Sequence, residues 1–197
     1  MLRLLRTYKS VAWLFLRYWK AYGGFKAVIT SPYVHCSIFV SVLVRSEWLT
    51  GDWTSAVLNT LPGLLGFALG GYAILLGFSD EGFRSRLAGR KTDSDPGPSP
   101  FILINATFVH FILIQILAIL LAVVAGADSV ASTFASILSA VCLNDFYDVL
   151  AATVRFAGYT LFVYAWFLAA AVTMSIFRLS CTYDNVMTKI RNKKSDS

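Results

Sequence analysis

Small and polar residues recur at alternating steps of four and three along residues 52–80, and mostly large apolar residues fill the positions between them. On an α-helix, this spacing places the small residues in a single stripe. A helix that is apolar all round except for a stripe of glycine is typical of a membrane span that a second helix approaches closely. The pattern predicts a span over residues 53–78. It also predicts a helix-packing surface, named the glycine seam, formed by Gly63, Gly66, Gly70, Ala73 and Gly77.

Three further apolar runs predict membrane spans over residues 26–44, 101–126 and 150–177. The first run is close to the minimum length that crosses about 30 Å of hydrocarbon. Pro32 lies in its first turns, where a missing amide donor costs least. The last run carries a second small-residue surface that includes Ala165 and Ala169. The four runs together predict an all-α membrane protein with four transmembrane helices.

Residues 1–24 place basic side chains on one arc of a predicted helix and apolar side chains on the rest of its surface. This distribution is typical of an amphipathic helix that lies in the headgroup layer of a membrane. A calmodulin-type target or a DNA-binding arm has similar charge, but the span that follows at once favours the membrane surface. Gly23 and Gly24 are expected to end this helix. Its basic residues include Arg3, Arg6, Lys9, Arg17 and Lys20.

Hydrophilic segments follow the second and fourth spans. We expect a cytoplasmic loop over residues 79–100 and a basic tail over residues 179–197, with the transmembrane domain over residues 25–178. Residues 130–143 are too short to span, and they predict a short helix that rests on the outer leaflet or dips into it. The basic residues of the loop and the tail are Arg84, Arg86, Arg90, Lys91, Lys189, Arg191, Lys193 and Lys194.

Composition and charge strengthen the membrane prediction. Of the 197 residues, 57% are hydrophobic and only 14% are charged, which excludes an ordinary soluble domain. If the N-terminus is cytoplasmic, 15 of the 17 Lys and Arg residues face the cytoplasm, and only Arg45 and Arg155 face outward. The positive-inside rule therefore predicts a multi-pass protein of the cell inner membrane with both termini in the cytoplasm.

Polar residues are sparse within the predicted spans. Asn105, His110 and Gln115 point in three directions around their helix, which predicts separate interhelical hydrogen bonds and no proton relay. Arg155 is expected to pair with Asp148 or Asp145, or to extend to the membrane interface. If the chain forms a pore, its candidate polar lining is Asp52, Asn59, Asp80 and Arg155.

The sequence carries none of the motifs that would predict catalysis. It has no P-loop, no GxGxxG, no H-E-x-x-H and no intramembrane-protease motif. Cys36, Cys142 and Cys181 lie far apart, so neither a disulfide framework nor a paired-cysteine metal site is predicted. Each polar segment has about 20 residues, too few for a separate catalytic domain. We expect no enzymatic activity, no cofactor and no bound metal.

These features favour a membrane subunit that self-associates as a homo-oligomer and uses its basic cytoplasmic surface to anchor, sense, and recruit or regulate a cytoplasmic protein partner. Anionic lipid headgroups alone also account for a basic surface. The alternative is a small oligomeric ion channel or pore-forming effector. A transporter is disfavoured because no inverted repeat is evident. Direct nucleic-acid binding is not expected, because the charge is segregated across the membrane.

By the architecture of its four predicted spans, the chain resembles the small four-span membrane subunits of bacterial anti-phage defence systems, the Kiwa-type subunit most of all. The resemblance implies an oligomer in the inner membrane and a response to phage at the envelope. It also implies a cytoplasmic, DNA-acting partner docked on the basic inner face. The resemblance covers all four spans and transfers no site residue.

Overall fold

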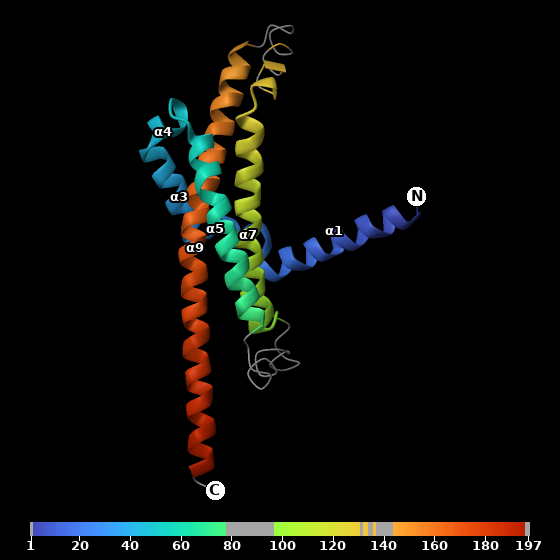
Figure 1. The fold of residues 1–197 in the computed structure, drawn as a ribbon, viewed down its shortest axis with the longest axis vertical. Coiled ribbons are helices and arrows are strands. Elements are labelled where there is room, and N and C mark those ends of the chain that lie inside the picture. Colours follow the sequence, from blue (N-terminus) through green and yellow to red (C-terminus); the bar gives the residue numbers. More distant parts are fainter. Residues whose placement is uncertain (1, 78–96, 131, 134–135, 137–143, 196–197) are drawn as a thin grey trace.

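The computed structural model describes residues 2–77, 97–130, 132–133, 136 and 144–195, and every regular element in these ranges is an α-helix. This agrees with the predicted all-α class. Three long helices pack together, with α1 (Leu2–Tyr22) extending away from their side (Figure 1). The three are α5 (Trp53–Gly77), α7 (Pro100–Ala125) and α9 (Asn144–Ser195).

Each of the three long helices contains a stretch that is long and apolar enough to cross a membrane. These stretches lie within or across the second, third and fourth predicted spans. Large apolar side chains remain exposed on them, as at Phe67, which is 82% exposed. Water disfavours such a surface, whereas lipid does not. The chain is therefore a membrane protein. The stretches are Trp53–Ile74, Pro100–Ala125 and Tyr147–Asn185.

The first predicted span, residues 26–44, is not one continuous helix. α2 (Gly24–Ile29) ends at Thr30, and α3 (Pro32–Leu43) begins at Pro32. Proline disfavours the helical conformation in the residue before it and lacks an amide donor, so Pro32 starts a new helix instead of continuing the old one. The 12 residues of α3 extend about 18 Å, less than the roughly 30 Å of hydrocarbon. The predicted span is therefore corrected to a broken segment.

The chain turns between α1 and α2 at two glycines. Gly23 has a φ of 106° and Gly24 a φ of 64°, both in the left-handed region that favours glycine. The two residues let the chain leave the end of α1 in a new direction. The predicted end of the first helix at these glycines is confirmed.

α5 and α9 run in the same direction, and α7 runs opposite to both. Trp53 at the start of α5 packs against Gly158 of α9, and Thr54 lies beside Gly126, just after α7. α4 (Arg45–Leu49) lies at this end of the bundle, because Phe156 of α9 contacts Trp48. The other end holds the last turn of α5 and the first turn of α7. Beyond it, α9 continues alone, so much of the predicted tail is helical (Figure 1).

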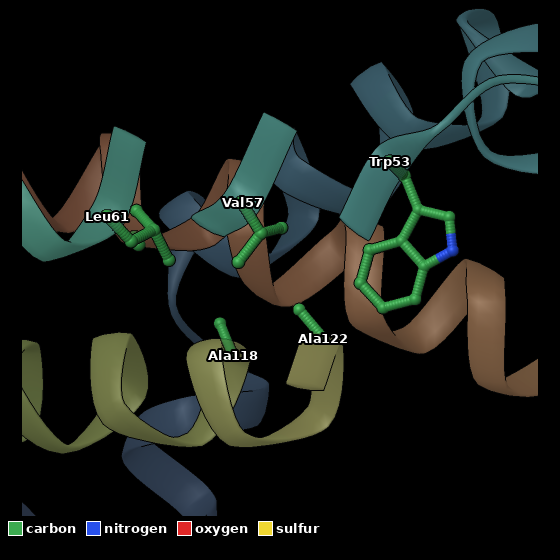
Figure 2. Packing of buried hydrophobic residues seen from close by; sticks show 6 residues of the cluster. Trp53, Val57, Leu61, Ala118 and Ala122 are labelled. Carbon is green, nitrogen blue, oxygen red and sulfur yellow. The ribbon is translucent and has the colours of Figure 1, made fainter. Parts of the chain in front are cut away.

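Two clusters of buried apolar side chains hold α5, α7 and α9 together. Figure 2 shows large side chains of α5 pointing toward alanines of α7, whose small size allows the two helices to approach closely. The first cluster contains Trp53, Val57, Leu61, Ala118, Ala122 and Ala165. The second contains Ala68, Phe108, Phe111, Tyr164, Leu168 and Val172.

Candidate functional site

A partly buried polar cluster joins α1 to the helix bundle. It consists of Tyr18, Tyr22, His110 and Tyr164, and we name it the tyrosine–histidine junction. Tyr18 and Tyr22 lie four residues apart near the end of α1, so both face the same side of that helix. His110 of α7 is 2% exposed and Tyr164 of α9 is 3% exposed. The junction therefore connects three helices that are far apart in the sequence.

Each ring nitrogen of His110 meets a tyrosine hydroxyl. Nδ1 lies 2.7 Å from Tyr18 Oη, and Nε2 lies 3.0 Å from Tyr164 Oη. A neutral imidazole has one donor and one acceptor nitrogen, so His110 donates to one hydroxyl and accepts from the other. The Tyr22 ring stacks on the imidazole with centroids 3.8 Å apart. Both polar atoms of the ring are satisfied in a place where an unpaired polar atom would be costly.

Tyr18, one of the two tyrosines that α1 contributes, stays protonated over the physiological pH range. Burial, and to a smaller extent the neighbouring Tyr22, raise the pKa of Tyr18 to about 12. A protonated phenol retains its hydrogen atom for the bond with His110. The junction is therefore a neutral, hydrogen-bonded connection that holds α1 on the bundle.

The glycine seam faces away from the rest of the protomer. A Cβ atom built on Gly63, Gly66, Gly70 or Gly77 would meet no atom of the described residues within 4 Å. Ala73 is exposed as well. The core residues of α5 lie on its other side, toward α7 and α9 (Figure 2). No described contact of the protomer covers the seam, so this face of α5 is open to a further helix.

The predicted small-residue surface of the fourth span instead lies within the protomer. Ala165 is fully buried in the first core cluster, and Ala169 packs against the second. Gly158 on the same helix makes the closest approach. A Cβ atom there would come within 2.6 Å of Cζ3 of Trp53, closer than side chains pack. These positions of α9 serve contacts inside one copy of the chain.

Of the four candidate pore residues, the structure describes Asp52, Asn59 and Arg155, and no hydrogen bond or ion pair joins these three. Asp52 caps α5, because its Oδ1 accepts hydrogen bonds from the Ser55 backbone N–H at 3.0 Å and from the Thr54 hydroxyl at 2.8 Å. The bonds to Ser55 and then Thr54 lower the pKa of Asp52. Asn59 is exposed on α5. Asp80 lies outside the described residues.

Arg155 lies at the same end of the bundle as Asp52 and α4, but the described residues show no ion pair between Arg155 and Asp52. Nη1 of Arg155 donates a hydrogen bond to the backbone carbonyl of Leu49 at 3.3 Å. The contact ties α9 to α4. Among the described residues, Asp148 forms no ion pair with Arg155, and the Asp145 side chain lies outside the described part.

The predicted basic surface is described in part. Arg6, Lys9, Arg17 and Lys20 of α1 are exposed, and so is Arg191 of α9. These side chains are available to lipid or to a protein partner. The remaining predicted contacts have side chains outside the described part of the chain: Arg3, Arg84, Arg86, Arg90, Lys91, Lys189, Lys193 and Lys194.

Of the three polar residues predicted to bond between helices, His110 does so. Gln115 is fully buried, but its Nε2 donates to the Phe111 carbonyl of its own helix at 3.4 Å. Its Oε1 and the Oδ1 of Asn105 have no hydrogen-bond partner among the described residues. The prediction that Gln115 bonds to another helix is therefore wrong among the described contacts, since its partner Phe111 belongs to the same helix.

Sequence reasoning identified His110 but did not find its partners. Tyr18 and His110 are 92 residues apart, and no spacing rule connects positions so distant. The sequence did contain a local sign that the end of α1 packs against another element. Tyr18, Trp19 and Tyr22 gather in the last turn of a basic helix, directly before a glycine pair. Such an aromatic cluster favours packing of that end of the helix against another element.

The described residues contain no group of three or more His, Cys, Asp or Glu side chains placed to hold a metal ion. The geometry thus offers two candidate functional features, the open glycine seam and the junction that docks α1. Comparison of the chain with protein-family models, with curated proteins and with solved structures found no match.

Proposed function

We propose that the chain is a non-enzymatic, self-associating subunit of the cell inner membrane that recruits or regulates a cytoplasmic protein. The open glycine seam carries this proposal, since its residues form an exposed face of α5 that nothing described in the protomer covers. Glycine lets two membrane helices approach closely and gain van der Waals contact. The proposed occupant of the seam is a second copy of the chain.

A homo-oligomer suits the shape of this face. The seam runs from Gly63 to Gly77, about 21 Å along the helix. Small residues over such a length give a continuous flat strip, and a two-fold axis beside α5 places the same strip of two copies in contact. Exposed apolar side chains next to the strip, such as Phe67, then gain contacts with the facing helix.

The proposed topology has four crossings and both termini in the cytoplasm. α2 and α3 together make the first crossing, which is broken near Ser31. Membranes tolerate a broken helix where protein covers the freed backbone groups. Ser31 is buried, and the buried Ser37 and Ser41 donate to backbone carbonyls within α3. This topology keeps 15 of the 17 Lys and Arg residues in the cytoplasm, as the positive-inside rule favours.

The proposed partner-binding surface is the basic cytoplasmic side. α9 continues past the bundle there and presents the exposed Arg178, Tyr183 and Arg191. A positive surface attracts an acidic face of a protein, and it also attracts anionic lipid. In keeping with the resemblance to Kiwa-type defence subunits, the proposed partner acts on DNA and the proposed stimulus is phage at the envelope. The chain itself is not proposed to bind nucleic acid.

Affinity purification of the full chain in mild detergent, followed by mass determination, tests this function. The expected particle contains several copies of the 21.7 kDa chain. It also retains a cytoplasmic protein that high salt removes, because salt screens the charges that hold it. A monomer of 21.7 kDa that retains no protein contradicts the proposal.

A second candidate function is a small oligomeric ion channel. Asn59 supports it, because its exposed side chain continues the spacing of the glycine seam. In an oligomer built on the seam, Asn59 from several copies would approach a common axis and line a polar path. Ion flux into liposomes that is reduced by Asn59→Ala is the expected result for a channel. Liposomes that contain verified oligomers and conduct no ions contradict it.

A further inference from the structure

A groove of about 420 Å³ lies between α1 and the first half of α7. Its volume falls within the range of about 300–1,000 Å³ that is typical of small-molecule sites. The walls are mainly apolar, with Leu14 and Ala21 on α1 and Ile102 and Val109 on α7. Arg17 is the charged residue that lines the groove. An apolar groove with one cationic side chain matches a ligand that has an apolar body and an anionic group.

Arg17 has no carboxylate partner within the described residues. Its side chain is exposed, and its Cζ lies 5.5 Å from the centroid of the Trp13 ring, over the indole. Stacking on an aromatic ring leaves the N–H donors at the edge of the guanidinium free to bind. A guanidinium binds phosphate oxygens through paired N–H donors. Phosphate is therefore the anionic group that best complements this side chain.

In the membrane placement proposed above, the groove spans the depth of a single leaflet. α7 begins at Pro100 and rises 1.5 Å per residue, so Ile102 is about 3 Å and Val109 about 14 Å along its axis. The hydrocarbon of one leaflet is about 15 Å thick. An acyl chain that enters at the start of α7 can follow the groove over this depth. Arginine has a long side chain that reaches toward the headgroup layer.

We propose that the groove binds one anionic phospholipid, with its phosphate on Arg17 and an acyl chain between α1 and α7. This site depends on the membrane placement proposed above and not on self-association. A lipid in the groove contacts both helices, so it binds the docked position of α1 more tightly than a released one. The lipid and the tyrosine–histidine junction therefore both stabilise the docked position of α1, which the turn at Gly23 and Gly24 would otherwise allow to change.

Native mass spectrometry of the full chain in mild detergent tests the lipid site, with phosphatidylglycerol and phosphatidylcholine as probes. We expect one phosphatidylglycerol retained per chain and weaker retention of phosphatidylcholine, which has no net charge. Arg17→Gln should weaken phosphatidylglycerol binding about tenfold or more, because a charge-assisted hydrogen bond is lost. Ala21→Phe should weaken both lipids by filling the groove. Lys26→Gln removes a positive charge from the neighbouring helix α2, outside the groove, and should leave retention unchanged.

Equal losses in Arg17→Gln and Lys26→Gln would indicate a diffuse charge effect and overturn the lipid site. Unchanged retention in Ala21→Phe would also overturn it. Displacement of the lipid by excess inorganic phosphate would assign Arg17 to free phosphate instead. Thermal unfolding of each variant in the same detergent shows whether it is folded. The same spectra report the number of copies, so loss of lipid and loss of self-association are read separately.

Discussion

His110 holds tyrosine hydroxyls from two other helices, one on each ring nitrogen. His110→Phe keeps a ring that stacks on Tyr22 but removes both hydrogen bonds and leaves the hydroxyls without that partner. We expect a loss of stability of about 1–3 kcal/mol and faster proteolysis of α1. Thermal unfolding and limited proteolysis measure the two effects. His35→Phe, the same exchange at an exposed histidine, is the matched control. Unchanged protection of α1 in His110→Phe would refute the role of the junction.

Tyr18 gives the docking of α1 a dependence on alkaline pH. Its pKa in the folded chain is about 12, above the ordinary value of 10.0, so the unfolded chain loses this proton first as the pH rises. The contribution of Tyr18 to stability is therefore complete below pH 10 and is lost as the pH rises through about 12. The difference in phenolate absorbance between the wild type and Tyr18→Phe should titrate near pH 12. A midpoint near pH 10 would indicate a solvated phenol.

At the scale of elements, one face of α5 packs in the core and the opposite face, which carries the glycine seam, is exposed. Gly158 of α9 meets the core face at Trp53, whereas Gly63 lies on the open face. Gly158→Ala forces the indole to move and should cost about 1–3 kcal/mol. Gly63→Ala should be neutral or stabilise the helix by up to about 1 kcal/mol, because alanine favours helix. Thermal unfolding in a detergent that keeps the chain monomeric compares the pair, and the opposite order of stability would contradict this packing.

The long helices were predictable because each is a long apolar run, a pattern that local sequence determines. The break at Pro32 was not predictable. Proline is tolerated in the first turn of a helix and also favoured at its first position, so the sequence does not tell whether Pro32 continues a helix or starts a new one. The helical tail was missed because its polar composition suggested a tail, although residues 178–195 contain neither glycine nor proline. Absence of helix breakers was the signal available there.

The candidate sites were predictable to a different extent. Periodicity identified the glycine seam, but not the direction it faces, since that depends on which side of α5 is covered by α7 and α9. The roles of Asp52 and Ala165 changed for the same reason. Asp52 caps a helix, and Ala165 fills the core of the protomer. Contacts between elements decide these roles, and a single sequence carries no direct record of them.

At the scale of the whole molecule, different surfaces of the chain have different roles. The two core clusters join α5, α7 and α9, the junction docks α1, and the glycine seam remains uncovered by described contacts. A change in the seam should therefore alter assembly without altering the fold of one copy. A change in the core should instead destabilise the fold of one copy before it alters assembly.

The central claim is self-association through the seam, and the mass of the purified protein in mild detergent tests it most directly. We expect the wild type, and the off-seam control Val123→Leu, at the same multiple of 21.7 kDa. Gly66→Leu combined with Gly70→Leu fills the strip where no described atom lies within 4 Å, so it should give a 21.7 kDa monomer that is still folded, as thermal unfolding shows. A wild-type monomer, or a double variant that keeps the wild-type mass, would contradict the claim.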